Sequence, residues 1–219
     1  MARRILAIVG IVLGLVGLGI DFAEMVPFSM VASEQNPVTR SLADALIWYL
    51  TYFTHLTNIG LVLVYVAVLT GWRWLGWFTR PQTQALMGGY ILLVMIYYHL
   101  MLAGLYPLEG RMLVATYLLH YVTPILYLGW WALFTPHGSL RWRDVPWMLA
   151  PGLIYVGWAM IRGATSGEYP YEILDAGRFG YGTVAMGVGT LVVAVAFFCG
   201  VIVLVDQLLA RRRATDAAV

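Results

Sequence analysis

Six long apolar stretches run through the 219-residue sequence, and each is close to the ~20 residues that a helix needs to cross ~30 Å of hydrocarbon. They cover residues 5–26, 42–69, 83–106, 112–134, 145–161 and 181–209. Unbroken apolar runs of this length differ from the alternation, with a period of two, that transmembrane β-strands show. We therefore expect an all-α membrane protein, in which a six-transmembrane-helix bundle forms a single domain over residues 1–219.

The composition narrows the functional classes. Hydrophobic residues make up 61% of the chain and charged residues 11%, which excludes a soluble globule and a disordered chain. A net charge of +2 gives no basic surface for nucleic acid. All 13 basic residues are arginine, which excludes a lysine Schiff base and a P-loop. The single cysteine, Cys199, excludes an internal disulfide and a thiolate metal cage, and we expect no cofactor.

The arginines predict the orientation of the spans. The connections on one side contain Arg3, Arg4, Arg73, Arg80, Arg141, Arg143, Arg211, Arg212 and Arg213. The connections on the other side contain only Arg40, Arg111, Arg162 and Arg178. Because cytoplasmic loops carry the excess of positive charge, we expect both termini in the cytoplasm. The first stretch also resembles a signal peptide, but no small-x-small cleavage pattern follows it, so we expect an uncleaved first helix.

The second stretch is the richest in polar side chains. A polar group inside hydrocarbon must be paired, so each one in a span suggests a functional site. At 100° per residue, one stripe of this stretch consists of Thr51, Thr54, His55 and Asn58. Counted along a continuous helix from Leu42, Thr54 lies ~18 Å below the outer end, which predicts a position near the midplane of the membrane.

Three other helices bring polar groups to the same half of the membrane. His120 lies ~12 Å below the outer end of the fourth stretch, and Pro124 removes a helical hydrogen bond from its carbonyl, which predicts a kink. His99 lies toward the outer half of the third stretch. Asp21 and Glu24 share one face at the outer end of the first stretch. We expect these groups to converge.

Each polar residue also has a structural interpretation. Threonines inside membranes commonly donate back to helix carbonyls or join helices. His137 lies in a cytoplasmic connection, where we expect a solvated side chain, and Asp206 lies near the C-terminal arginines, where we expect an interfacial charge. The connection over residues 162–180 is either a cap over the helices or an ordinary polar turn.

Several segments resemble signatures of Pr6Pr, a family of bacterial six-span membrane proteins. These segments are Tyr52-Phe53-Thr54-x-x-Thr57-Asn58, Leu119-His120-x-x-x-Pro124, Arg141-Trp142-Arg143-Asp144, Tyr169-Pro170-Tyr171-x-x-Leu174-Asp175 and Gly180-Tyr181-Gly182. They keep the order and spacing of the family's motifs over most of the chain. The resemblance implies a multi-pass integral protein of the bacterial inner membrane.

The family is distantly similar to the androgen-induced membrane hydrolases of eukaryotes, which cleave fatty acid esters of hydroxy fatty acids. The resemblance implies that their threonine nucleophile corresponds to Thr54 and that their histidine preceding a proline corresponds to His120. Their Tyr-Pro segment corresponds to residues 169–175. Where those enzymes carry an aspartate three residues after the threonine, this sequence has Thr57.

The leading hypothesis is an intramembrane hydrolase of lipid esters, such as fatty acid esters of hydroxy fatty acids, whose partners are membrane lipids. Thr54 attacks the ester carbonyl, and His120 takes up the proton. Asn58, one turn below Thr54, is expected to donate to the oxyanion. A carboxylate is expected to orient His120 or His99, and the candidates are Asp21, Glu24 and Asp175.

Three other interpretations remain open. A zinc hydrolase is one of them, because His55, His99 and His120 with Asp21 or Glu24 supply enough ligands, although their spacing follows no metal motif. The same histidines also fit a bis-histidine haem. Alternatively, the chain is a non-catalytic lipid-binding or sensory protein in which the polar cluster joins helices. A transporter is disfavoured because the sequence contains no inverted repeat.

Overall fold

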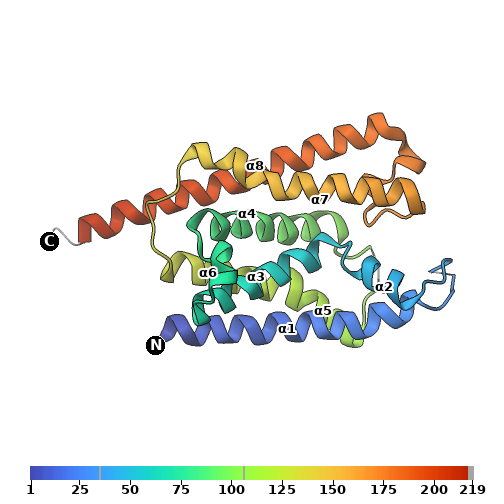
Figure 1. Ribbon diagram of the computed structural model, residues 1–219, viewed down its shortest axis with the longest axis horizontal. Coiled ribbons are helices and arrows are strands. Elements are labelled where there is room, and N and C mark those ends of the chain that lie inside the picture. Colours follow the sequence, from blue (N-terminus) through green and yellow to red (C-terminus); the bar gives the residue numbers. More distant parts are fainter. Residues whose placement is uncertain (35, 106, 217–219) are drawn as a thin grey trace. The chain divides into compact units, whose positions relative to one another are not determined.

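The computed structural model describes residues 1–34, 36–105 and 107–216. Within this part of the chain, 83% of the residues are helical and no strand is present. Its helices that are long and apolar enough to cross a membrane are Ala2–Ser29, Phe53–Thr70, Pro81–Leu102, Gly110–Phe134, Trp142–Ser166 and Ala176–Thr215 (Figure 1). The expected all-α, six-span fold of a multi-pass membrane protein is confirmed.

The chain, expected to form one domain, divides into two compact units. The first comprises Met1–Arg80 and Val94–Thr135, and the second comprises Pro81–Leu93 and the chain from Pro136 on. The division falls inside α4 (Pro81–Tyr97). The candidate residues Asp21, Thr54, His55, Asn58, His99 and His120 all belong to the first unit, so their arrangement is a property of that unit alone.

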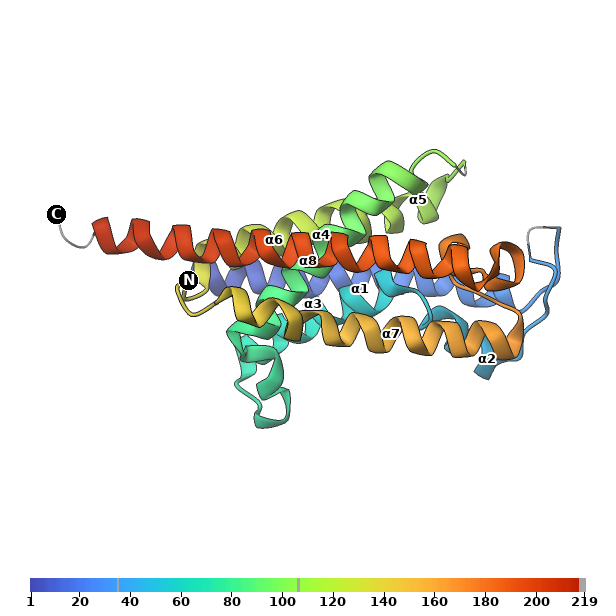
Figure 2. The ribbon, with the colours of Figure 1, turned by 90° about the horizontal axis from the view of Figure 1, so that it is seen from above.

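In the first unit, α1 (Ala2–Ser29) packs along three other helices (Figure 2). These helices are α3 (Phe53–Thr70), α5 (Gly110–Tyr117) and α6 (Thr123–Phe134). The core between them contains the buried aromatic rings of Tyr65, Tyr127 and Trp130. Together with α2 (Leu42–Tyr49) and the turns η2 (Tyr98–Leu102) and η3 (Leu118–Val122), these elements hold the residues around Thr54 and His120.

Small residues allow α1 to approach its neighbours closely. A Cβ atom added to Gly14 would lie 2.8 Å from a Val62 methyl group, and one added to Gly17 would lie 2.9 Å from Leu119. Asp21 follows Gly17 at a spacing of four, so it lies on the same buried face of α1. The close approach of this face brings the Asp21 carboxylate against the beginning of α3.

The second predicted stretch, residues 42–69, is not one helix. It divides into α2 (Leu42–Tyr49) and α3, and the residue before α3, Tyr52, is extended. The last carbonyl of α2 accepts from the His55 side chain, so an imidazole ends this helix. Thr54 consequently lies in the first turn of α3, and the depth counted along a continuous helix is wrong.

The third and fourth predicted stretches each contain a π-helical turn. α4 continues into η2 (Tyr98–Leu102), while η3 (Leu118–Val122) joins α5 to α6. η3 carries His120 and ends just before Pro124, which has no N–H to continue a regular helix, so the predicted irregularity is present as a wide turn. Tyr106, the predicted end of the third stretch, lies outside the described residues.

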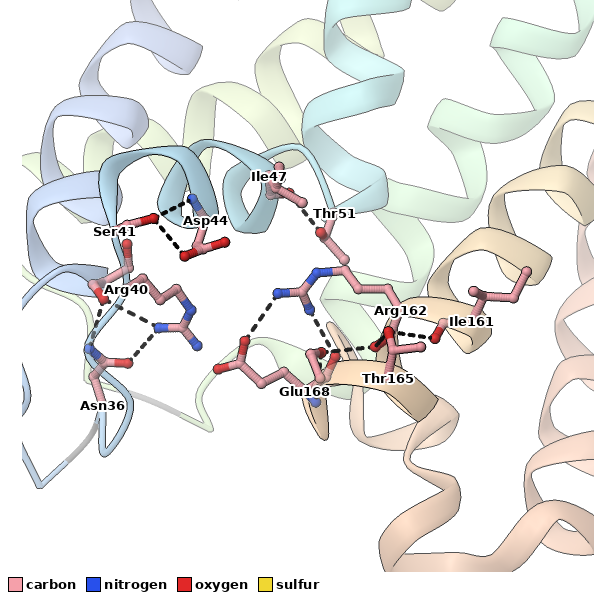
Figure 3. A network of polar contacts seen from close by, with 12 residues as sticks. Asn36, Arg40, Ser41, Asp44, Ile47, Thr51, Ile161, Arg162, Thr165 and Glu168 are labelled. Atoms are coloured by element: carbon pink, nitrogen blue, oxygen red, sulfur yellow. Dashed lines mark hydrogen bonds and ion pairs between the residues drawn. The ribbon is translucent and has the colours of Figure 1, made fainter.

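The connection between α1 and α2 is tied down by two side chains that Figure 3 shows. The two hydrogens of the Asn36 Nδ2 amide are shared among the carbonyls of Phe28, Ser29 and Val31, of which Val31 is nearest at 2.8 Å. Oδ1 of Asn36 accepts from Arg40 at 2.8 Å (Figure 3). These bonds fix the end of α1, which carries the acidic residues of the candidate site.

In the second unit, α7 (Val145–Ser166) and α8 (Ala176–Asp216) pack side by side (Figure 2). α7 continues beyond its predicted end at residue 161. α8 is interrupted at Gly180, whose φ of 75° favours glycine, and its regular part begins at Tyr181 as predicted. Two short 3₁₀ turns, η4 (Trp142–Asp144) and η5 (Glu172–Leu174), precede these helices.

The segment between α7 and α8 folds back onto its own helices. Arg162 donates to the Glu168 carbonyl at 2.9 Å and pairs with the Glu168 carboxylate at 3.0 Å (Figure 3). The Tyr169 ring lies so close to Gly163 that a side chain there would overlap it. This connection is therefore an ordered part of the second unit.

His137 and Asp206 form a buried pair, so the expectations of a solvated histidine and an interfacial charge are wrong. Their Nδ1 and Oδ1 atoms lie 3.0 Å apart, and the side chains are 0% and 2% exposed. The other oxygen of Asp206 accepts from the backbone N–H groups of Gly138 and Leu140. The carboxylate thus ties the connection before η4 to α8, where these bonds offset the cost of its burial.

Candidate functional site

Asp21 and His55 form a buried pair between α1 and α3. Asp21 lies on the glycine-lined face of α1, and His55 lies in the first turn of α3. Oδ2 of Asp21 is 2.8 Å from Nε2 of His55, and the side chains are only 8% and 5% exposed. Because an isolated ionisable group inside a membrane is costly, each of these side chains depends on the other.

Tyr49 completes the surroundings of His55. Nδ1 of His55 donates to the Tyr49 carbonyl at 2.6 Å, and the two rings stack at 4.0 Å. The Tyr49 hydroxyl donates to the Leu18 carbonyl on α1 at 2.9 Å. Burial raises the pKa of the Tyr49 phenol, and the Asp21 carboxylate adds to this effect, so the phenol remains protonated and continues to donate. Both ring nitrogens of His55 therefore have partners, since Nδ1 bonds the Tyr49 carbonyl and Nε2 bonds the Asp21 carboxylate.

Thr54 and His120 meet between α3 and η3. Oγ1 of Thr54 is 3.4 Å from Nε2 of His120, while Nδ1 of His120 lies 3.0 Å from the Thr116 carbonyl. A carbonyl only accepts, so in the neutral imidazole Nδ1 carries the proton and Nε2 presents its lone pair to the Thr54 hydroxyl. The predicted approach of these two side chains is confirmed, and their chemical role remains a prediction.

Tyr98 fixes the plane of the His120 imidazole. The two rings stack with their centroids 4.0 Å apart and an angle of 28° between the planes. A hydrogen bond from one edge and a ring on one face therefore hold His120 toward Thr54. This contact could not be predicted from the sequence, because Tyr98 belongs to the π-helical η2, whose register differs from that of a regular helix.

Asn58 joins helices and does not offer a free donor. Its Nδ2 amide donates to the carbonyls of Thr54, at 2.9 Å, and Leu119, at 3.2 Å. Its Oδ1 accepts from the Thr123 hydroxyl at 2.5 Å. Since an amide nitrogen has only two hydrogens, neither is left for a substrate oxygen, and the expected oxyanion role of Asn58 is wrong.

Replacing Thr123 by valine is expected to lower the free energy of unfolding by ~1–3 kcal/mol, because the buried Oδ1 of Asn58 loses its donor. The measurement is denaturant-induced unfolding of the purified protein in detergent. Thr57→Val is the matched control, since the Thr57 hydroxyl donates only locally, to the Phe53 carbonyl at 2.8 Å. Equal losses in the two variants would contradict a helix-joining role for the Thr123–Asn58 bond.

The other predicted supporting residues have partners of their own. His99 is exposed, and its Nδ1 lies 3.1 Å from the Tyr121 hydroxyl. Glu24 pairs with Arg111 at 3.2 Å. Asp175 belongs to the second unit, where its carboxylate accepts from the backbone N–H of Arg178 at the start of α8. Among the candidate acids, Asp21 alone is bonded to a residue adjacent to Thr54, and it pairs with His55 rather than with His120.

The three membrane histidines do not assemble the alternative metal centre. His55 contacts Asp21, His99 contacts Tyr121, and His120 contacts Thr54. Within residues 1–34, 36–105 and 107–216, no group of three or more His, Cys, Asp or Glu side chains is arranged to hold a metal ion. The histidines therefore act in separate polar contacts in this structure.

The contact between Thr54 and His120 has the geometry of an activated nucleophile. A hydroxyl faces a nitrogen lone pair, and the other ring nitrogen is oriented by an acceptor. That acceptor is the Thr116 carbonyl, which occupies the position that a carboxylate has in a triad. Comparisons with protein-family models, curated proteins and solved structures find no match.

Proposed function

We propose that this protein is an intramembrane hydrolase of lipid esters in which Thr54 is the nucleophile and His120 is the general base. The observation that carries the proposal is the 3.4 Å contact between Oγ1 of Thr54 and the unprotonated Nε2 of His120. A spacing slightly above ~2.6–3.2 Å is common before substrate is bound. Thr54 and His120 are called the reacting pair.

The first half of the reaction transfers the acyl group to Thr54. Oγ1 of Thr54 attacks the ester carbonyl carbon, and its proton moves to Nε2 of His120. When the tetrahedral intermediate collapses, the bond between the carbonyl carbon and the alcohol oxygen breaks, and the leaving oxygen takes the proton from Nε2. The products of this half are the free alcohol and an acyl ester of Thr54.

The second half releases the fatty acid. A water molecule attacks the acyl carbon while Nε2 of His120 takes one of its protons. Collapse of the second tetrahedral intermediate breaks the bond to Oγ1 of Thr54, which recovers a proton from Nε2. One ester and one water thus give one alcohol and one fatty acid, and the reacting pair returns to its starting state.

The first turn of α3 supplies a donor that can replace the one expected from Asn58. Thr54 is the second residue of α3, and the N–H groups of a first helical turn have no acceptor within their helix. The positive end of the helix dipole also lies there. The backbone of Thr54 is therefore well placed to stabilise negative charge on an oxygen next to its own side chain.

Structural hydrogen bonds, within one helix or between helices, account for Thr57 and Thr123 but not for Thr54. Thr57 donates back to the Phe53 carbonyl, and Thr123 donates to Asn58. Thr54 instead faces a histidine nitrogen that can accept its proton. This difference favours a hydrolase over a non-catalytic lipid-binding or sensory protein.

We also propose membership of Pr6Pr, residence in the bacterial inner membrane, and an ester substrate of the lipid class that includes fatty acid esters of hydroxy fatty acids. Support comes from the order and spacing of the matching segments in the sequence. Two of these segments, Tyr52 to Asn58 and Leu119 to Pro124, supply the reacting pair and the proline that follows it.

A fluorophosphonate that carries a fluorophore is expected to label the protein covalently at Thr54. Its phosphorus is attacked like an ester carbonyl, so labelling reports the nucleophile without any knowledge of the substrate. The measurement is in-gel fluorescence, followed by mass spectrometry of the labelled peptide. His120→Ala is expected to label about 10²-fold more slowly or worse, because the base is lost.

Thr57→Val is the control for this labelling, since its hydroxyl is removed from the same helix without touching the reacting pair. It is expected to label at the rate of the unaltered protein. Labelling that persists in Thr54→Val would assign the reactive hydroxyl to another residue, and labelling that is unaffected by His120→Ala would remove His120 as the base. Either result would remove the basis of the proposal.

A further inference from the structure

An exposed ion pair marks the water boundary above the reacting pair. Nε of Arg111 is 3.2 Å from Oε1 of Glu24, and the side chains are 68% and 37% exposed. Exposed charges belong in the headgroup region or in water rather than in hydrocarbon. Glu24 follows Asp21 by three residues, so Asp21 and its partner His55, the neighbour of Thr54, lie only ~4.5 Å deeper along α1.

A second pair of polar side chains lies at the level of His120. His99 directly follows Tyr98, which stacks on His120, and Tyr121 directly follows His120. Nδ1 of His99 is 3.1 Å from the Tyr121 hydroxyl, and the His99 side chain is exposed. An exposed imidazole that bonds a phenol is typical of the membrane interface, where one end of an aromatic side chain is apolar and the other is wet.

The depth of Thr54 can also be counted from the cytoplasmic end of α3, and this count likewise places Thr54 near the outer edge of the membrane. α3 ends at Thr70 and is followed by Trp72 and Trp74, which are exposed and stacked at 5.7 Å, as interfacial indoles are. Sixteen residues separate Thr54 from Thr70, which corresponds to ~24 Å along the helix. In ~30 Å of hydrocarbon, Thr54 therefore lies only ~6 Å from the outer edge.

We propose that the scissile ester lies at the glycerol level of an outer-leaflet lipid, so that the enzyme prefers acyl esters of glycerol to esters in the middle of a hydroxy fatty acid chain. This inference rests on the proposed hydrolase activity and changes the order of its substrates, since fatty acid esters of hydroxy fatty acids become slower substrates than glycerol esters. A glycerol ester joins its chain directly to the headgroup, and its carbonyl therefore lies at the edge of the hydrocarbon. An ester in the middle of a chain would have to rise, and it would draw methylene groups into a polar region.

The test compares esters that release the same labelled fatty acid from different depths. The purified full chain is placed in phosphatidylcholine vesicles that contain a labelled diacylglycerol, a labelled phosphatidylglycerol, or the same acyl group on the mid-chain hydroxyl of hydroxystearic acid. At least one glycerol ester is expected to be hydrolysed at least about tenfold faster than the mid-chain ester, which corresponds to about two methylenes drawn from hydrocarbon. The two glycerol esters distinguish a neutral lipid from a phospholipid.

Equal or faster hydrolysis of the mid-chain ester, if it depends on Thr54, would overturn the depth inference and leave the hydrolase intact. If no ester is hydrolysed in a Thr54-dependent manner, the proposed function fails. In that case, the depth of the start of α3 is measured by fluorescence quenching. The fluorophore is attached to the cysteine of Leu56→Cys, in a protein whose own cysteine is removed by Cys199→Ala. A fluorophore on this partly exposed position, two residues after Thr54, is expected to be quenched most by lipids brominated near the headgroup. Strongest quenching by bromines near the chain ends would overturn the inference directly.

Discussion

Replacing Thr54 by valine is expected to lower lipid ester turnover by about 10³-fold or more while the protein stays folded. Valine keeps the branched shape of threonine and removes the hydroxyl that faces Nε2 of His120 at 3.4 Å. Without this oxygen, no acyl ester of the protein can form. The measurement is the release of labelled fatty acid by purified protein in vesicles, with the unfolding midpoint recorded in parallel.

Two variants control this result. Thr54→Ser retains a hydroxyl at the same position and is expected to retain much of the turnover. Thr57→Val removes a hydroxyl three residues away that donates only to the Phe53 carbonyl, and it is expected to change turnover by no more than about twofold. If Thr54→Val and Thr57→Val are equally active, Thr54 has no chemical role, and its contact with His120 only joins helices.

The spans could be predicted from the sequence because each is a long apolar run, and this property does not depend on tertiary contacts. The break between α2 and α3 could not be predicted in this way, since Leu50, Tyr52 and Phe53 continue the apolar pattern. At the break, the His55 imidazole donates to the last carbonyl of α2 and also pairs with Asp21 on another helix. The break thus coincides with a contact between helices that the apolar run does not reveal.

For the candidate site as well, the sequence indicates which residues are involved but not all of their contacts. Thr54 and His120 stand out because polar residues inside apolar runs are rare, and the resemblance assigned them complementary roles. The role of Asn58 was predicted wrongly, because its amide donates to the Leu119 carbonyl on η3, and contacts between helices are not encoded in the periodicity of either one. The pairing of Asp21 with His55 was missed for the same reason.

Breaking the pair between Asp21 and His55 is expected to have the largest effect on stability. Asp21→Leu or His55→Leu alone should lower the free energy of unfolding by ~3–5 kcal/mol, because the remaining ionisable group is left buried without its partner. His55→Leu also removes the donor to the Tyr49 carbonyl at the end of α2. The measurement is reversible unfolding of the purified protein in detergent micelles.

The double variant Asp21→Leu/His55→Leu is expected to lose less stability than the sum of the single variants, since it leaves no unpaired charge. The Asp21→Asn side chain can still bond Nε2 of His55, so the free energy of unfolding of this variant should lie between those of the unaltered protein and Asp21→Leu. Additive losses in the double variant would show that the two side chains are stabilised independently, and the 2.8 Å contact would then contribute no coupling energy.

Turnover in the stable members of this series separates two roles of the buried pair. His55 is bonded to α1 through Asp21 and to α2 through the Tyr49 carbonyl, so it holds the start of α3, where Thr54 lies. If the pair positions Thr54, Asp21→Asn should keep kcat and the double variant should lower kcat more than it raises KM, because the hydroxyl would meet Nε2 of His120 less often. If the pair contributes only stability, every variant that remains folded should turn over ester at the unaltered rate.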